Sequence, residues 1–181
     1  MKDIVPTARL QRIDVDISVV NDIYDIIAFL PASIWVDHLL SESCTGFDFS
    51  FGPDMVADIT SGLIQRWKEM DPRRLPQKIF AGMRMKDVDP REFMEFDVES
   101  VDPPLRQKIE RIFADVSHRR VVDQYAEIQT RTEYIEHPVY PAFRIYAVFR
   151  GHGETKQYFG ETEKWTKEDW FTNTRCTLLV E

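Results

Sequence analysis

Four side chains in the last third of the sequence are candidates for catalysis on a phosphate-bearing substrate. Arg131, Arg144, Tyr146 and His152 lie in or beside segments whose alternation of polar and apolar residues predicts neighbouring β-strands. Arginine binds phosphate oxygens through paired N–H donors, and such donors stabilise a developing negative charge without a metal. One interpretation is therefore a metal-independent enzyme that acts on a phosphate-bearing or RNA substrate through an Arg/Tyr/His sheet face.

The same arginines have a simpler interpretation as partners of acids on adjacent strands. Oppositely charged side chains often face each other on neighbouring strands at the solvent-exposed surface of a sheet. His152 lies between two glycines, and no neighbour in the sequence would orient it as a base. We favour this second interpretation, in which the arginines pair with Glu127, Glu133 and Glu161.

Other reactive residue types occur without the spacing that catalysis or metal binding requires. The two cysteines, Cys44 and Cys176, form no C-x-x-C pair, which is typical of free thiols in a reducing, cytoplasmic environment. The four histidines show no H-x-H or H-E-x-x-H spacing, and the glycine-rich phosphate loops are absent from the sequence. Asp54 and Asp58 would share a helix face, which a solvated surface explains. The sequence therefore predicts no cofactor and no metal site.

Acidic side chains are segregated along the chain. The sequence has 31 Asp and Glu against 23 Lys and Arg, a net charge of −8. No Lys or Arg occurs from Ile13 to Gln65, and a second acidic run extends from Asp87 to Asp102. If these acids lie on the surface, their negative charge attracts a basic protein at long range. They would repel DNA and RNA, because proteins bind nucleic-acid phosphates through Lys and Arg side chains. We therefore expect a basic protein partner and no direct binding of DNA.

The second acidic run is the candidate partner-binding surface. Phe93, Met94 and Phe96 lie among its acids, so we expect the run to be anchored to the core. The predicted function is a non-enzymatic acidic module, such as an inhibitor, an immunity protein or a nucleic-acid mimic. This prediction requires that the basic segment 66–86 does not cover the acids, and a self-associating subunit is a third interpretation. The candidate residues are Asp87, Asp89, Glu92, Glu95, Asp97 and Glu99.

Hydrophobic periodicity predicts the elements that position these residues. The segments with helical spacing of apolar residues are 22–30, 33–40, 54–70, 74–85 and 104–116. Alternation predicts strands at 10–19 and 128–134, and further strands are predicted at 142–150, 155–161 and 174–180. Residues 87–104 are predicted to be mostly loop, and Thr166-x-x-Asp169 resembles a helix capping box.

This order of elements predicts one α+β domain over residues 1–181. The helix-rich part is 20–124 and the antiparallel meander is 126–181, with the strand at 10–19 joining the same sheet. Helices that precede a meander are expected to pack on one face of its sheet. The sequence has no apolar run of bilayer-spanning length, and its first 16 residues do not resemble a secretory signal. We therefore expect a cytoplasmic protein that does not enter membranes.

Overall fold

The computed structural model describes residues 30–49, 53–98, 101–118, 128–152, 156–158, 161–163 and 165–181. The helices in these ranges are α3 (Ala32–Leu39), α4 (Pro53–Glu69), α5 (Pro103–His118) and α6 (Lys167–Asn173), with the short 3-10 turns η2 (Pro72–Arg74) and η3 (Pro90–Glu92). The strands are β1 (Gly46–Asp48), β2 (Lys78–Arg84), β3 (Met94–Glu95), β4 (Ile128–Glu136), β5 (Arg144–His152), β6 (Lys156–Tyr158), β7 (Glu161–Glu163) and β8 (Arg175–Val180).

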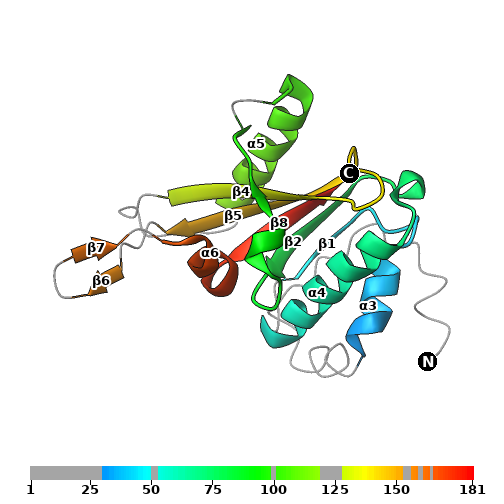
Figure 1. Cartoon of the computed structure of the whole chain (residues 1–181), viewed down its shortest axis with the longest axis horizontal. Coiled ribbons are helices and arrows are strands. Elements are labelled where there is room, and N and C mark those ends of the chain that lie inside the picture. Colours follow the sequence, from blue (N-terminus) through cyan, green and yellow to red (C-terminus); the bar gives the residue numbers. More distant parts are fainter. Residues whose placement is uncertain are drawn as a thin grey trace.

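Within the described ranges, six strands form one twisted sheet in the order β1-β2-β8-β5-β4-β3 (Figure 1). β1 and β2 are parallel and are joined through α4, while every other neighbouring pair is antiparallel. β6 pairs only with β7 in a separate ribbon, so the predicted return strand at 155–161 does not extend the main sheet. A mixed, mostly antiparallel sheet with these helices confirms the α+β class.

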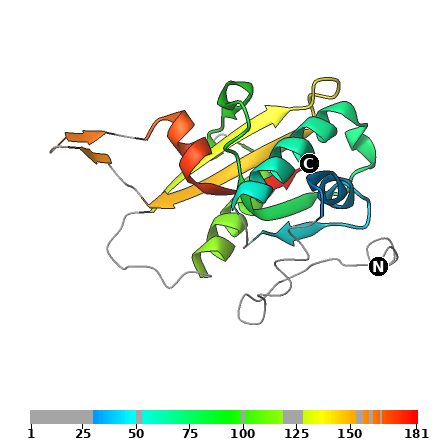
Figure 2. The same ribbon diagram turned by 90° about the horizontal axis from the view of Figure 1, so that it is seen from below.

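The sheet is buried on both faces by different helices (Figure 2). Ile145, Ala147 and Phe149 of β5 lie in a major core with α3, α4 and α6. Tyr146 and Val148 of the same strand lie in a minor core with α5. The structure therefore differs from the expectation that all helices pack on one face. The physical reason is that β5 and β8 carry apolar residues at consecutive positions, which is typical of strands covered on both sides.

Most elements predicted from periodicity are confirmed. α3, α4, α5, β4, β5 and β8 match their predicted segments within a few residues. The capping box is also confirmed, because the Thr166 hydroxyl accepts from the Asp169 N–H and the Asp169 carboxylate accepts from the Thr166 N–H. The predicted strand at 10–19 and helix at 22–30 lie outside the described residues.

The predicted helix at 74–85 is wrong, because Lys78–Arg84 form strand β2. The register of β2 against β8 shifts between Phe80 and Met83, so a bulge interrupts the alternation of buried and exposed positions. Gly82, in this bulge, has φ 74°, and a Cβ there would lie 2.2 Å from the Phe49 carbonyl oxygen. The bulge therefore explains why this segment does not show the two-residue period that is typical of a half-buried strand.

His137 fixes the end of α4 to the turn between β4 and β5. Its buried ring places Nε2 3.0 Å from the carbonyl oxygens of both Trp67 and Met70. Nδ1 accepts from the N–H groups of Val139 and Tyr140, both at 3.2 Å. These contacts assign the ring proton to Nε2 and give His137 a structural role rather than a catalytic one.

Candidate functional site

The acidic run lies along one edge of the sheet. We call residues 87–97 the acidic edge segment; it contains η3 and the outer strand β3, which pairs with β4. Val88 and Phe93 are buried in the major core, and Phe93 meets Phe171 of α6 edge to face. The Phe96 N–H donates to the Thr132 carbonyl oxygen at 3.0 Å. The apolar residues therefore anchor the segment, as the sequence indicated.

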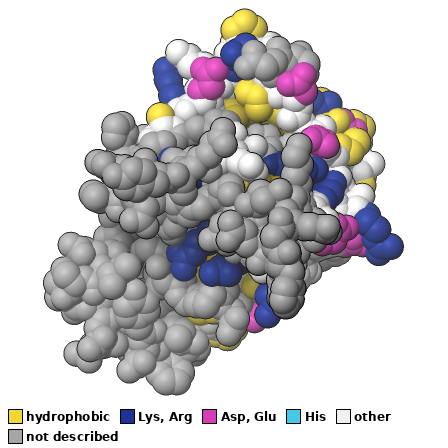
Figure 3. All heavy atoms as spheres, turned by 90° about the vertical axis from the view of Figure 1, so that its left-hand side faces the viewer, with side chains coloured by type: hydrophobic (Ala, Val, Ile, Leu, Met, Phe, Trp, Pro, Cys, Tyr) yellow, Lys and Arg dark blue, Asp and Glu magenta, His cyan; other side chains and the backbone are white. Residues whose placement is uncertain are grey.

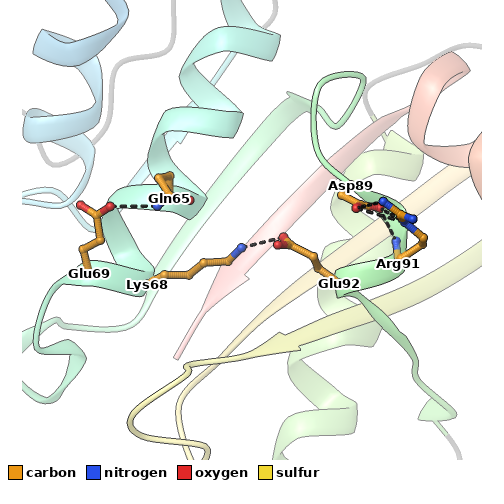
Figure 4. A network of polar contacts seen from close by, with 6 residues as sticks. All are labelled: Gln65, Lys68, Glu69, Asp89, Arg91 and Glu92. Atoms are coloured by element: carbon orange, nitrogen blue, oxygen red, sulfur yellow. Dashed lines mark hydrogen bonds and ion pairs between the residues drawn. The ribbon is translucent and has the colours of Figure 1, made fainter.

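Two of its acids have basic partners close by (Figure 4). Asp89 receives hydrogen bonds from the side chain and the backbone N–H of Arg91, and these lower the pKa of Asp89 to about 2. Glu92 pairs with Lys68 of α4 at 2.6 Å. Lys68 belongs to the basic segment 66–86, so that segment does neutralise one of the candidate acids.

A third acid, Glu95, lies 3.5 Å from Arg131, and the side chains of the remaining described acids are exposed as well. Asp87, Glu95 and Asp97 are exposed, and the Glu95 side chain retains 76% of its accessible surface. Met94 stands beside Glu95 on β3 with 42% of its surface exposed. Glu99 lies outside the described residues. Met94 lies opposite Tyr134 and Glu95 lies opposite Glu133, so the exposed apolar side chain and the exposed carboxylate are on opposite faces of the outer strand.

Beneath this surface, one buried carboxylate connects three elements. Glu133 of β4 is fully buried and pairs with Arg131 at 2.6 Å and with Lys167 of α6 at 2.9 Å. Lys167 also donates to the carbonyl oxygen of Phe93 in the acidic edge segment. Arg131 lies 3.5 Å from Glu95 as well. Arg131 therefore belongs to a structural charge cluster: it pairs with Glu133, as the simpler interpretation expected, but within one strand and not across two, while the side chains of Glu127 and Glu161 lie outside the described part of the structure.

The four candidate catalytic residues are not brought together. Arg131 lies opposite Phe149, on the major-core face, whereas Tyr146 lies in the minor core on the other face of the sheet. Arg144 lies opposite Glu136, five residues farther along β4 than Arg131. For His152 the structure describes only the backbone, which pairs with Ile128. To form one active site, all four side chains would have to lie on the same face of the sheet and at the same end of its strands.

Arg144 and Tyr146 are occupied by contacts within the protein. Arg144 donates to Glu136 at 2.7 Å, and its guanidinium lies 4.8 Å from the centre of the Tyr134 ring. Burial raises the pKa of Tyr146, although the Arg144 side chain opposes the shift. Tyr146 therefore remains protonated at neutral pH and is not suited to act as a base.

The buried thiols and the buried amine are also structural. Burial raises the pKa of both Cys44 and Cys176, so neither thiol is activated as a nucleophile. Lys78 is fully buried, and its ammonium donates to the carbonyl oxygens of Ser41 and Cys44 in the loop after α3. Among the described residues, no group of three metal-ligating side chains is present.

In the part of the chain that the structure describes, no helix combines the length and apolar character needed to cross a bilayer.

Comparisons with protein-family models, with curated proteins and with solved structures give no match for this chain. Inference about function therefore depends on the geometry and charge of the residues themselves.

Proposed function

We propose that the chain is a non-enzymatic protein-binding module whose acidic edge segment docks against a basic partner surface. The observation that carries this proposal is that the outer strand β3 exposes an apolar side chain, Met94, on one face and the carboxylate of Glu95 on the other, with the exposed Asp97 two residues farther along the chain. Protein interfaces commonly place an apolar side chain at the centre and charged groups at the rim. An inhibitor, an immunity protein or a nucleic-acid mimic would each use such a surface.

The ion pairs within the segment do not oppose docking. Asp89–Arg91 and Glu92–Lys68 both include well-exposed side chains, and exposed pairs contribute about 1 kcal/mol or less. A partner's arginine or lysine can therefore share these carboxylates at little cost. Burial of the remaining surface of Met94 adds about 1 kcal/mol. The long-range field of the net charge of −8 favours the approach of a basic protein.

Neutralising the outermost acids tests this proposal directly. We compare the wild type, E95Q/D97N and a matched control, D37N/E42Q, whose exposed acids lie on α3 and the loop after it. The probe is a fluorescent lysine- and arginine-rich peptide, measured by anisotropy from low to high salt. We expect E95Q/D97N to bind about tenfold more weakly, because two pairs of about 0.7 kcal/mol each make one decade. The control is expected to bind like the wild type.

The Met94→Ala variant separates docking from simple charge attraction. A docked Met94 loses contacts when truncated, so dissociation is expected to be faster while association is unchanged. Equal affinity of E95Q/D97N and the wild type at low salt would contradict the proposal. Equal weakening by the α3 control would do so as well, since binding would then follow net charge alone.

A further inference from the structure

The outer strand β3 covers only part of the edge of β4. β3 is two residues long, and beyond it the Phe96 N–H donates to the Thr132 carbonyl oxygen at 3.0 Å. β4 extends four residues farther, and in the described part of the chain no strand pairs with this outer edge. We call the outer edge of residues 128–131 the open edge.

The open edge carries backbone groups that can bond to a further strand. In a β-strand the N–H and C=O of one residue point to the same side, and successive residues point to opposite sides. Because the Thr132 carbonyl points outward to Phe96, the N–H and C=O of Thr130 point outward as well. Thr130 is exposed, so its two backbone groups face solvent. Such an edge is a template for pairing with another chain.

A groove of about 550 Å³ follows the open edge. It is lined by the consecutive residues 129–132 of β4, whose side chains alternate between the two faces of the sheet. A cavity that touches both sets of side chains lies along the edge of the strand and not over one face. On the side of α5 the groove is lined by Phe96, Val98 and Glu110. On the side of α6 it is lined by Glu95, Trp165 and Trp170.

The walls of the groove favour a basic occupant. Side chains of Glu95 and Glu110 keep 76% and 54% of their accessible surface, one on each wall. Arg131 is the one basic residue of the described lining, and it already pairs with the buried Glu133. Glu95 lies 3.5 Å from Arg131, and Glu110 accepts from Arg106 at 2.9 Å, but exposed pairs such as these contribute little and can be shared. Figure 3 looks at this end of the molecule, and acidic side chains lie exposed at its top, over α5.

We propose that the basic partner contributes an extended segment, which pairs with the open edge of β4 as an added strand. This inference rests on the proposed function, because the same partner meets the acidic edge segment beside the groove. In complexes of this kind, backbone hydrogen bonds give affinity and alternate side chains give specificity. One set of side chains would lie against Glu95 and Trp165, where a carboxylate and an aromatic ring suit Lys or Arg. The other set would lie against Phe96 and Val98.

N-methylated peptides test the backbone pairing without a change of charge. The parent probe is a fluorescent hexapeptide of alternating arginine and threonine, and two isomers carry N-methyl groups on all arginine or on all threonine amides. In an extended segment these two sets of amides point to opposite sides, so only one set can donate to β4. We expect one isomer to bind the whole chain at least about tenfold more weakly than the parent, and the other within about twofold. Equal anisotropy titrations for both isomers would overturn the inference.

Thr130→Pro removes the outward N–H from the protein side. Proline is tolerated on an edge strand where its missing N–H faces away from the neighbouring strand. The matched control is T130V, which keeps the N–H and changes only the side chain. We expect T130P to bind the parent peptide at least about fivefold more weakly than the wild type and T130V. If T130P does not fold, the isomers still decide the question on the wild type.

The E95Q/D97N variant separates this inference from the proposed function. Weaker binding of the parent peptide by E95Q/D97N supports docking at the acidic edge segment. If T130P then binds like T130V and the two isomers bind alike, the proposed function stands and the added strand is refuted.

Hydrogen exchange at the Thr130 amide detects any other occupant of the open edge. We expect this amide to exchange rapidly in the free chain and to become protected when the parent peptide binds. Slow exchange in the free, monomeric chain would show that another segment of the chain already covers the edge. A dimer in sedimentation that T130P abolishes would show that the occupant is a second copy of the chain. Either result would overturn the inference.

Discussion

Glu133 is one of two charged residues that are completely buried in the described part of the chain; the other is Lys78. The Glu133 side chain has no accessible surface, and it pairs with Arg131 of its own strand and with Lys167 of α6. Enclosing a carboxylate is costly unless cations and hydrogen bonds accompany it. Glu133 therefore connects β4 to α6 through its ion pair with Lys167, and Lys167 in turn contacts the acidic edge segment at Phe93.

Replacement of Glu133 by glutamine is expected to destabilise the protein. The change leaves Arg131 and Lys167 side by side without their shared anion, and breaking a buried pair costs about 3 kcal/mol. Urea unfolding of E133Q measures this loss. The control is E95Q, whose exposed side chain also contacts Arg131 and is expected to lose less than about 1 kcal/mol. Similar stabilities for the two variants would contradict a structural role for the buried charge.

Lys78 is expected to make stability depend on pH in the alkaline range. Burial lowers the pKa of Lys78 below its usual 10.5, and the nearby Cys44 and Glu42 only partly oppose this. Between the lowered value and 10.5, the unfolded chain binds more protons than the folded one, so the free energy of unfolding rises with pH. Below the lowered pKa, Lys78 is protonated in both the folded and the unfolded state. The full cost of burying its charge then destabilises the folded protein.

The K78M variant isolates this contribution. Urea unfolding from neutral pH to about pH 10 is expected to show that the wild type gains stability relative to K78M as the pH rises. K86M, which removes an exposed lysine, is the control and is expected to follow the wild type. Parallel curves for the wild type and K78M would show that the Lys78 ammonium does not titrate in this window.

At the scale of elements, the bulge in β2 determines how the first half of the chain joins the sheet. Gly82 combines φ 74° with a close approach to the Phe49 carbonyl, and the Phe49 N–H donates to Ala81 at 2.9 Å. Any side chain at position 82 would collide with the backbone of Phe49, which cannot move aside as the end of a flexible side chain could. The position therefore requires glycine for two separate physical reasons.

Gly82→Ala is expected to destabilise the protein by more than about 2 kcal/mol. The left-handed conformation alone costs an L-residue about 1 to 2 kcal/mol, and the contact with the Phe49 oxygen adds to this. The control is G62A in α4, where alanine favours the helix and the new Cβ lies 3.1 Å from a Val36 methyl group and meets no backbone atom of another element. G62A is expected to remain within about 1 kcal/mol of the wild type. Thermal melts with equal shifts would refute this interpretation of the bulge.

The same bulge shows where prediction from sequence ends. Periodicity identified α4, α5 and β4, and runs of apolar residues identified β5 and β8, because in each of these elements one pattern continues along most of its length. β2 has a register shift in its middle, and its segment resembled a helix for that reason. The placement of α5 on the opposite face was not predicted either, because a run of apolar residues shows that both faces are covered without showing which helix covers each.

At the scale of the whole molecule, the position of the acidic run was predictable and its charge partners were not. Acids mixed with phenylalanines indicated an anchored surface segment, which the structure contains. The pairing of Glu92 with Lys68 depends on the packing of α4 beside η3. No local pattern carries that information, because the two residues are 24 positions apart.

The alignment of Arg84, Arg175 and Arg150 on neighbouring strands was even less accessible to sequence analysis. Arg150 and Arg175 were recognisable as strand residues, but Arg84 was placed in a predicted helix. Their alignment results from the registers of β2 against β8 and of β8 against β5, which place core residues such as Met83, Cys176 and Phe149 beside one another. Only the assembled sheet shows that these charges share one face.

β8 is the last of the described strands in the sequence, yet it lies between β2 and β5 in the middle of the sheet. During synthesis, β2 and β5 emerge from the ribosome before the strand that joins them. Until β8 follows, the nascent chain holds two sheet edges with unpaired backbone groups and apolar side chains in water. The topology therefore predicts that chaperones bind this intermediate and that it tends to aggregate where they do not.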